Sequence, residues 1–138
     1  MSTKNITVDV PTLLTQSGTS HTVLLTTFRR NGQGVSTPVG VVAADGKLYF
    51  MTPTHTGKAK RLARNPSVAL ALCTYRGKVQ SPTVEGTARR LTGAEAQQAR
   101  TWLRIGILGQ FWNIVFNLRY PGEKTAVYEI QLATETSP

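Results

Sequence analysis

The sequence contains few of the side chains from which catalytic and metal sites are usually built. Its 138 residues include one cysteine, Cys73, and two histidines, His21 and His55. A single cysteine excludes a disulfide within the chain, and so few cysteines and histidines argue against a zinc site. No serine or cysteine lies in a Gly-x-Ser-x-Gly context, and Cys73 lies in an apolar run, where an inert core thiol is expected. If the chain is an enzyme, a cofactor should supply the difficult chemistry.

Acidic residues are also scarce. Seven Asp and Glu stand against sixteen Lys and Arg, for a formal charge of +9. The acidic residues fall mostly in predicted turns, caps and strand faces, and no pair of them suggests acid and base roles. Between Lys58 and Arg90 eight basic residues are opposed only by Glu85. Such an excess favours a polyanionic partner, namely nucleic acid, an anionic membrane surface or a phosphorylated ligand, although a solvated basic face explains the charge equally well.

The sequence also lacks a long hydrophobic run. The apolar stretch at residues 105–116 has about a dozen residues, fewer than the roughly twenty needed to span a bilayer, so we expect a buried or subunit-facing segment and no membrane span. The start of the chain has no signal-peptide pattern, which predicts a cytoplasmic location. No linker, repeat or low-complexity segment divides the chain, and residues 1–138 are therefore expected to form one domain.

Alternating and β-branched runs predict six strands, and Asn31-Gly32 and Asp45-Gly46 are strong hairpin signals. Short helices are expected after Val10 and after Thr56. A longer helix is expected after Thr92, with Glu95 reaching back to the Thr92 amide as a capping box. The predicted strands span residues 21–28, 35–42, 48–52, 67–75, 83–91 and 125–132. The pattern predicts an α+β domain built on a compact antiparallel barrel with helices outside.

The stretch from Met51 to Pro66 predicts an anion site at the start of a helix. Thr56 is a suitable N-cap, and Gly57 lets a ligand approach the free amides of the first turn. Lys58 and Arg61 are three residues apart and therefore share a helix face. We interpret this stretch as the phosphate clamp of a bound cofactor.

A second feature extends this site into a groove. Ser36-Thr37-Pro38-Val39 is a strand segment whose proline lacks an amide hydrogen, so its ladder must open at an edge, at a bulge or toward a ligand. Met51-Thr52 ends the strand expected to be hydrogen-bonded beside it. A flat heteroaromatic ring on these strands would place its phosphate on the helix. On spacing alone, an edge-strand proline and solvated lysines are slightly favoured over a cofactor site. His55 lies in the intervening loop, where a histidine is more often a surface residue than a ligand or a proton donor.

These motifs together resemble a known superfamily. Val23-Leu-Leu-Thr-Thr-Phe-Arg-Arg-Asn-Gly32, Val35-Ser-Thr-Pro-Val39, Leu48-Tyr-Phe-Met-Thr52, Thr56-Gly-Lys-Ala-Lys-Arg-Leu-Ala-Arg-Asn-Pro-Ser-Val68 and Val84-Glu-Gly-Thr-Ala-Arg90 are similar to the split-barrel flavin and deazaflavin oxidoreductases. This is the superfamily of pyridoxamine 5'-phosphate oxidase, and the resemblance is strongest to its actinobacterial branch of coenzyme F-420-dependent enzymes. It covers about Thr22 to Leu132 and implies a six-stranded antiparallel split β-barrel that binds a flavin.

The resemblance also implies site residues. It places the ring along Ser36, Thr37, Pro38 and Val39, beside Met51 and Thr52, with the phosphate on Gly57, Lys58 and Arg61. Gln80 falls where the oxidase branch has a glutamine that contacts the cofactor. Members of the superfamily are usually homodimers with two cofactor sites at the subunit interface, which makes Trp112 of the apolar stretch a candidate for completing the partner's site.

One departure concerns the cofactor. Where the oxidases carry an arginine directly before the phosphate-binding lysine, this sequence has Gly57. The resemblance therefore implies a weaker grip on FMN and favours F-420, whose acidic tail suits the basic residues at Lys60 and Arg64. The implied activity is hydride transfer between the reduced deazaflavin and an electron-poor, unsaturated small molecule. FMN, haem or a tetrapyrrole is the alternative ligand. A non-catalytic nucleic-acid-binding barrel is a further alternative, although Tyr75 is the only aromatic residue between Lys58 and Arg90.

Overall fold

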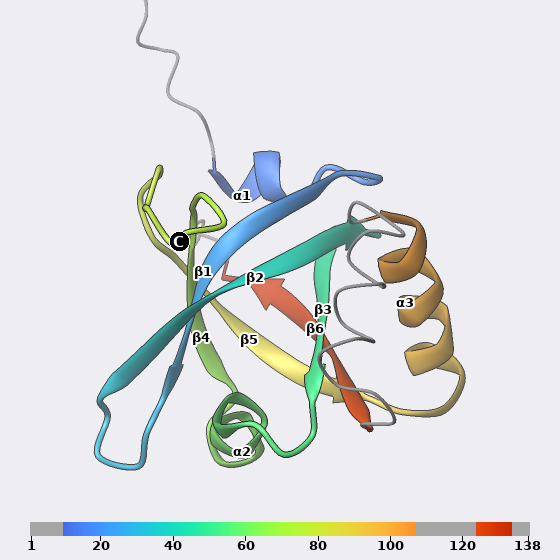
Figure 1. Cartoon of the computed structure of the whole chain (residues 1–138). Helices are drawn as coiled ribbons and strands as arrows, with labels where there is room; N and C mark the ends of the chain where they lie inside the picture. Colours follow the sequence, from blue (N-terminus) through green and yellow to red (C-terminus); the bar gives the residue numbers. More distant parts are fainter. Residues whose placement is uncertain (1–9, 107–123, 134–138) are drawn as a thin grey trace, which may run out of the picture.

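A computed structural model describes residues 10–106 and 124–133 of the chain. It contains six strands and three helices in these ranges (Figure 1). In chain order they are α1 (Val10–Leu14), β1 (Ser20–Phe28), β2 (Gly34–Ala44), β3 (Lys47–Pro53), α2 (Gly57–Arg64), β4 (Ser67–Leu72), β5 (Val84–Leu91), α3 (Gly93–Gly106) and β6 (Thr125–Leu132). Every predicted strand is present. Most of the apolar stretch at residues 105–116, including Trp112, lies outside the described residues.

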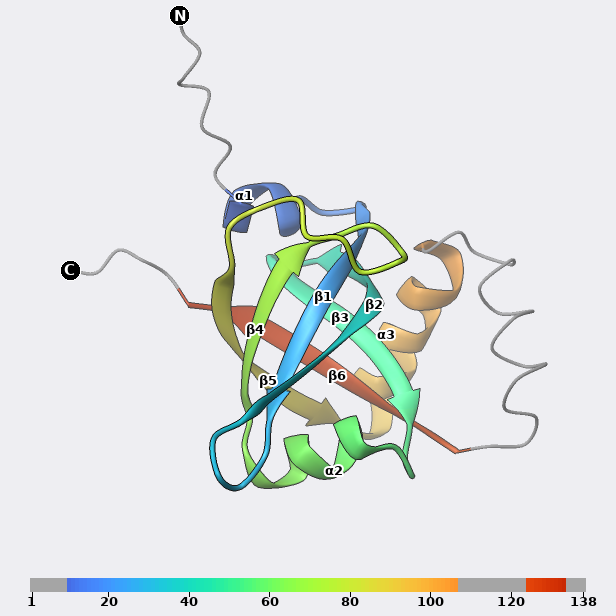
Figure 2. The same ribbon diagram turned by 60° about the vertical axis from the view of Figure 1, so that its left-hand side comes forward.

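The six strands close into an antiparallel barrel in the order β1-β2-β3-β6-β5-β4, with β4 pairing back to β1. The barrel wraps around an apolar core, and the two views in Figures 1 and 2 show α2 at one end of it and α3 along one side. Alternate residues of each strand point into this core; among the most deeply buried are Val23, Leu25, Val41, Leu48, Phe50, Leu70 and Ile130. The predicted α+β class and six-stranded barrel are therefore confirmed.

Both predicted hairpin turns form. Asp45 and Gly46 adopt positive φ angles of 52° and 76°, the left-handed conformation that a two-residue hairpin turn between β2 and β3 requires. Gly32 has a φ of 89° in the turn between β1 and β2, where the Arg29 amide bonds to the Gln33 carbonyl at 2.9 Å. Local sequence therefore determines the first two strand reversals.

The barrel opens on one side of β2. This strand pairs with β1 from Gly34 to Val42, but with β3 only from Val42 to Ala44. Pro38, opposite Leu24, thus lies in a segment with a strand neighbour on one side only, as its missing amide hydrogen predicted. Strand β3 is hydrogen-bonded beside β2 as predicted, but only near the turn that joins them, so Met51 and Thr52 at the far end of β3 have β6 as their strand neighbour.

Helix α3 covers the outer face of β2, β3 and β6 (Figure 1). Ala99 and Leu103 of the helix pack there against outward-facing strand residues such as Tyr49 and Val127. The helix begins after Thr92 as predicted, but the predicted capping box is wrong. Both carboxylate oxygens of Glu95 accept hydrogen bonds from Arg89, because a guanidinium offers two donors to this carboxylate. None of the described helices is long and apolar enough to cross a bilayer.

Candidate cofactor site at the open end of the barrel

The start of α2 is organised by threonine hydroxyls. Thr56 is the N-cap: its hydroxyl accepts a hydrogen bond of 3.2 Å from the Ala59 amide and donates one of 3.0 Å to the Pro53 carbonyl. The Thr52 hydroxyl, at the end of β3, lies 3.2 Å from that of Thr56. These bonds join the end of β3 to the first turn of the helix, so the free amides of that turn have a defined position at the open end of the barrel.

Arg61 connects α2 to the other side of the opening. Its Nε donates a hydrogen bond of 2.6 Å to the hydroxyl of Thr27, a residue of β1 that is 1% exposed. The same guanidinium lies over Gly57, where an added Cβ would be 2.8 Å from Nη1. Gly57 therefore has a structural role beyond backbone freedom, since its missing side chain leaves room for Arg61.

The two basic residues of the shared helix face lie close together. Burial and, to a smaller extent, the nearby charge of Arg61 lower the pKa of Lys58. The pKa of Arg61 is lowered by burial and by Arg29. Within residues 10–106 and 124–133, neither Lys58 nor Arg61 forms an ion pair with a carboxylate. A half-buried cluster of cations without a counterion is a site for an anion.

A polar lining adjoins these cations inside the barrel. Thr27 and Thr52 are almost fully buried on the inward faces of β1 and β3. Thr37 follows the same inward alternation on β2, opposite Leu25. Its hydroxyl oxygen is buried and has no hydrogen-bond partner among the described residues. Because buried polar atoms are rarely left unpaired, Thr37 fits a ligand that enters from the open side of β2.

The other predicted ring contacts are divided between two faces. Ser36 and Pro38 point outward, and the Ser36 hydroxyl bonds to Thr26 at 2.7 Å. Val39 packs against the barrel core. The side chain of Met51 lies beneath α3, where its sulfur is 3.6 Å from Nη1 of Arg100. Because neighbouring side chains of a strand point to opposite faces, these residues cannot all contact one ring with their side chains. Met51, whose side chain lies under α3, could contact a ligand in the groove only through its backbone.

Gln80 lies in the loop between β4 and β5. The side chain of Gln80 is exposed, and its backbone amide donates a hydrogen bond of 2.7 Å to the Leu72 carbonyl. Gly77 of the same loop, with a φ of 92°, approaches the outer side of Pro38, since an added Cβ would be 3.6 Å from the proline Cγ. The loop therefore borders the outer face of the predicted ring-binding strand.

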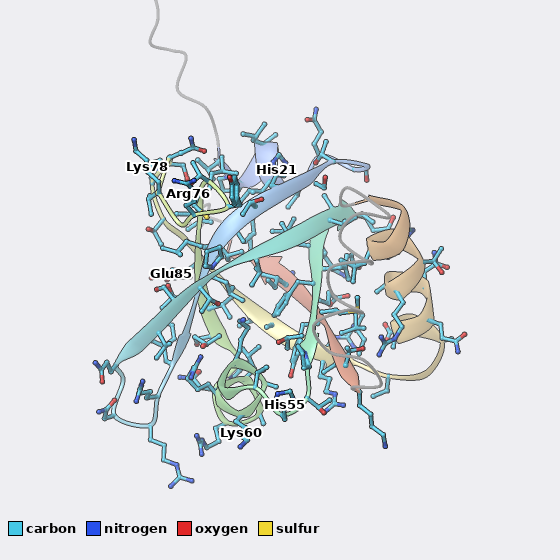
Figure 3. The ribbon with its side chains drawn as sticks, viewed as in Figure 1. His21, His55, Lys60, Arg76, Lys78 and Glu85 are labelled. Carbon is cyan, nitrogen blue, oxygen red and sulfur yellow. The ribbon has the colours of Figure 1, made fainter. Side chains whose placement is uncertain are left out.

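Two further residues near α2 lie apart from this arrangement. Lys60 and His55 are exposed (Figure 3), and Lys60 borders a hollow between α2 and strands β5 and β6 that is also lined by Arg90 and Tyr128. Sequence reasoning missed Thr27 and Arg29. The inward alternation of β1 could have identified Thr27, whereas the position of Arg29 depends on how β1 and α2 pack.

Comparison with protein families identifies the chain. Residues 12–125 match the sequence model of pyridoxamine 5'-phosphate oxidase. The chain belongs to the pyridoxamine 5'-phosphate oxidase family. No curated protein sequence matches it significantly. Membership of this family agrees with the six-stranded barrel and establishes the superfamily that the motifs indicated.

Solved structures share the fold of this family member. The haem storage protein HutZ from Vibrio cholerae has a TM-score of 0.64 and 15% identity, covering 83% of this chain and 82% of its own. An FAD-binding protein from Mesorhizobium loti has a TM-score of 0.60 and 16% identity, covering 83% and 80%. Atu2129 from Agrobacterium tumefaciens, of unknown function, has a TM-score of 0.62 and 18% identity; the match covers 88% of this chain and only 54% of Atu2129. At these identities the likeness establishes the fold alone.

Proposed function

We propose that this protein is an oxidoreductase that binds coenzyme F-420 in the opening between β2 and β3. It would transfer a hydride between the reduced deazaflavin and an electron-poor, unsaturated small molecule. The observation that carries the proposal is the pair of cations at the start of α2. Arg61 lies close enough for its charge to help lower the pKa of Lys58, and no described carboxylate forms an ion pair with either residue. A phosphate group would provide the missing charge.

The residues of the chain would hold and orient this cofactor. Lys58, Arg61 and the free amides after Thr56 would bind its phosphate, and the unpaired hydroxyl of Thr37 would meet a polar group of the ring system. The remaining predicted contacts are Ser36, Pro38, Val39, Met51, Thr52, Gly57 and Gln80. When bound, the deazaflavin supplies the hydride chemistry. The protein contributes position and a fixed positive field.

Gly57 supports F-420 over FMN. The guanidinium of Arg61 occupies the space above Gly57, so an arginine at position 57, as the oxidases carry, would require Arg61 to move. The chain thus presents one lysine and one tethered arginine to the phosphate. Lys60 and Arg64, both exposed on α2, are available to the acidic tail of F-420.

A binding titration tests the proposal. We expect F-420 fluorescence to be quenched on binding, and Lys58→Ala to weaken binding by about tenfold or more, because a hydrogen bond to a charged group contributes about 1.5–3 kcal/mol. Lys78→Ala is the control, since it removes an exposed cation that has no role in the proposed site and should change the affinity much less. Absence of quenching by the wild-type protein, or equal losses in both variants, would contradict the proposal.

The solved structures favour a second group of ligands within the same fold. HutZ is named a haem storage protein, and the Mesorhizobium loti protein is named FAD-binding. Absorbance spectra of the purified protein with FMN and with haem would separate these ligands from F-420. A Soret band shift with haem, without binding of F-420, would favour the storage function.

Because the chain has a formal charge of +9, a non-catalytic nucleic-acid-binding barrel is the functional class that competes with an oxidoreductase. Tyr75 is 77% exposed, and Arg76 lies 5.9 Å from its ring centroid. One such residue is a small stacking platform for a single strand. A fluorescence-anisotropy titration with single-stranded DNA and RNA would reveal that function by an affinity that falls steeply with salt.

Homodimerisation is a further part of the proposal, because the superfamily that the sequence resembles usually forms its cofactor sites between two subunits. Analytical ultracentrifugation should give twice the mass of one chain. A monomer that still binds F-420 would separate cofactor binding from dimerisation.

A further inference from the structure

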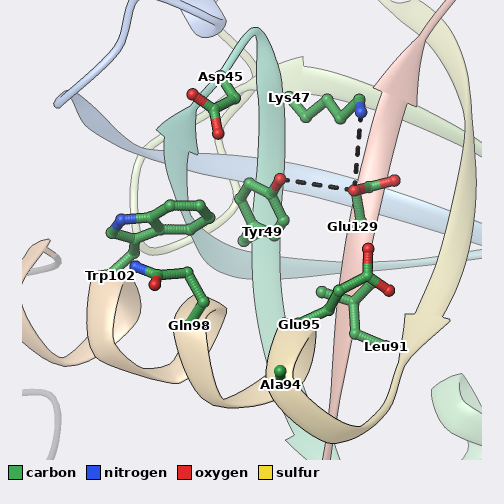
Figure 4. A pocket seen from close by; sticks show the side chains of 9 residues that line it. All are labelled: Asp45, Lys47, Tyr49, Leu91, Ala94, Glu95, Gln98, Trp102 and Glu129. Atoms are coloured by element: carbon green, nitrogen blue, oxygen red, sulfur yellow. Dashed lines mark hydrogen bonds and ion pairs between the residues drawn. The ribbon is translucent and has the colours of Figure 1, made fainter.

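A cavity of about 380 Å³ lies outside the barrel, between α3 and the outer face of β3 and β6 (Figure 4). Tyr49 and Glu129 of its wall project outward from these strands, whereas the proposed cofactor site faces the barrel interior near α2. Helix α3 contributes Glu95 and Trp102, and the β2–β3 turn contributes Asp45. The cavity is therefore distinct from the cofactor site.

The floor of the cavity is a neutralised carboxylate. Glu129 is 9% exposed and accepts hydrogen bonds from Arg89 at 3.2–3.3 Å. Its other contacts are Lys47 Nζ at 3.9 Å and the Tyr49 hydroxyl, which donates at 3.5 Å. Since Glu129 already has these partners, it forms a fixed polar floor. Another acidic residue of the cavity, Asp45, would have to attract a charged ligand.

An aromatic pair forms part of the wall. The rings of Tyr49 and Trp102 lie 5.1 Å apart between centroids, tilted by 53°. Figure 4 shows the Asp45 carboxylate on the side of the cavity above these rings, and its charge is one of the causes that raise the pKa of Tyr49. Aromatic faces beside a carboxylate favour a cation with an apolar body.

The charge of the cavity is opposite to that of the protein. The structure describes four acidic side chains, and three of them (Asp45, Glu95 and Glu129) line this cavity. Lys47 and Arg89 balance two of the three carboxylates. Asp45 forms no ion pair with another described residue. A chain of charge +9 thus contains a hollow with one negative charge in excess.

The lining residues and the volume of the cavity limit the kind of cation that would fit it. Among the described residues, no group of three histidine, cysteine, aspartate or glutamate side chains could hold a metal ion. The volume lies at the lower end of the roughly 300–1,000 Å³ range of small-molecule sites. We propose that this cavity binds a small organic ammonium ion, with the cation between Asp45 and the ring of Trp102. The proposal is independent of F-420 binding.

A matched pair of probes tests this site. Choline carries a quaternary ammonium group, and 3,3-dimethylbutan-1-ol has the same shape without the charge. We expect choline to shift the indole N–H resonance of Trp102 saturably in a ¹⁵N–¹H spectrum, with Trp102→Phe identifying the peak. The alcohol should shift it much less. Equal shifts from both probes, or no saturable shift with choline in the millimolar range, would refute the proposal.

Two charge variants locate the binding. Asp45→Asn should weaken choline binding about fivefold, equivalent to about 1 kcal/mol. Asparagine tolerates the positive φ of 52° at this position, so the turn should keep its shape. Glu85→Gln makes the same charge change at an exposed position of β5 outside the cavity and should leave the affinity unchanged. Equal effects of the two variants would show that only the net charge matters and would overturn the site.

Discussion

Arg61 donates a hydrogen bond of 2.6 Å from Nε to the hydroxyl of Thr27, which lies 34 positions earlier in the chain. This bond fixes the guanidinium across the open end of the barrel, on the helix face that also carries Lys58. A surface arginine usually samples many rotamers, and fixing it costs conformational entropy. Here the side chain of Arg61 loses that entropy on folding, so both cations are already positioned before an anion binds.

Removing the Thr27 hydroxyl should release Arg61. In Thr27→Val a methyl group replaces a buried hydroxyl of similar shape, so the fold should persist while the guanidinium loses its anchor. We expect F-420 affinity to fall several-fold, less than in Lys58→Ala, as measured by fluorescence titration. Thr87→Val is the matched control, because it makes the same change at an exposed position of β5 that the proposed site does not include. Unchanged affinity in Thr27→Val would show that the anchor has no part in binding.

Adding a methyl group at Gly57 should act through the same guanidinium. The new Cβ would be 2.8 Å from Nη1 of Arg61, so this flexible group would have to move. Because alanine is a better helix former than glycine, the thermal stability of Gly57→Ala should be equal or slightly higher, while F-420 affinity falls. The double variant with Thr27→Val should lose less than the sum of the single losses. Additive losses would contradict a shared mechanism.

The two carboxylates bound to Arg89 should differ in their contribution to stability. Glu129→Gln leaves a nearly buried amide in place of an ion and should lower the free energy of unfolding by about 1–3 kcal/mol in urea denaturation. Glu95→Gln should have a smaller effect, because the side chains of Glu95 and Arg89 are 60% and 55% exposed and solvent screens their interaction. A larger loss for Glu95→Gln would contradict this ranking.

Tyr49 should make stability depend on pH in the alkaline range. Burial, together with the charges of Glu129 and Asp45, raises its pKa from 10.0 to about 12. The folded state therefore holds the phenol proton more tightly than the unfolded state. This contribution is fully present below pH 10 and is lost as the pH rises toward 12. Urea unfolding at pH 9 and pH 11 should show a smaller loss of stability for Tyr49→Phe than for the wild type; parallel losses would argue against this role.

Local patterns predicted much of the fold and part of the site. Asn31-Gly32 and Asp45-Gly46 identified the hairpins because positive φ angles restrict the residues that can occupy such turns. Thr56 and Asn65-Pro66 identified both ends of α2 because capping depends on immediate neighbours. The predicted capping box failed because of competition between partners: Arg89, from the preceding strand, binds the Glu95 carboxylate.

By itself the sequence determined the six strands, the barrel class and the face shared by Lys58 and Arg61, because periodicity and short-range chemistry suffice for these features. Tertiary structure alone decided the anchor of Arg61 on Thr27, the unpaired hydroxyl of Thr37 and the gathering of three acidic residues against α3. These features join residues that are distant in the chain. Their proximity depends on strand register, on the twist of β2 away from β3 and on the packing of α3, which no local pattern encodes.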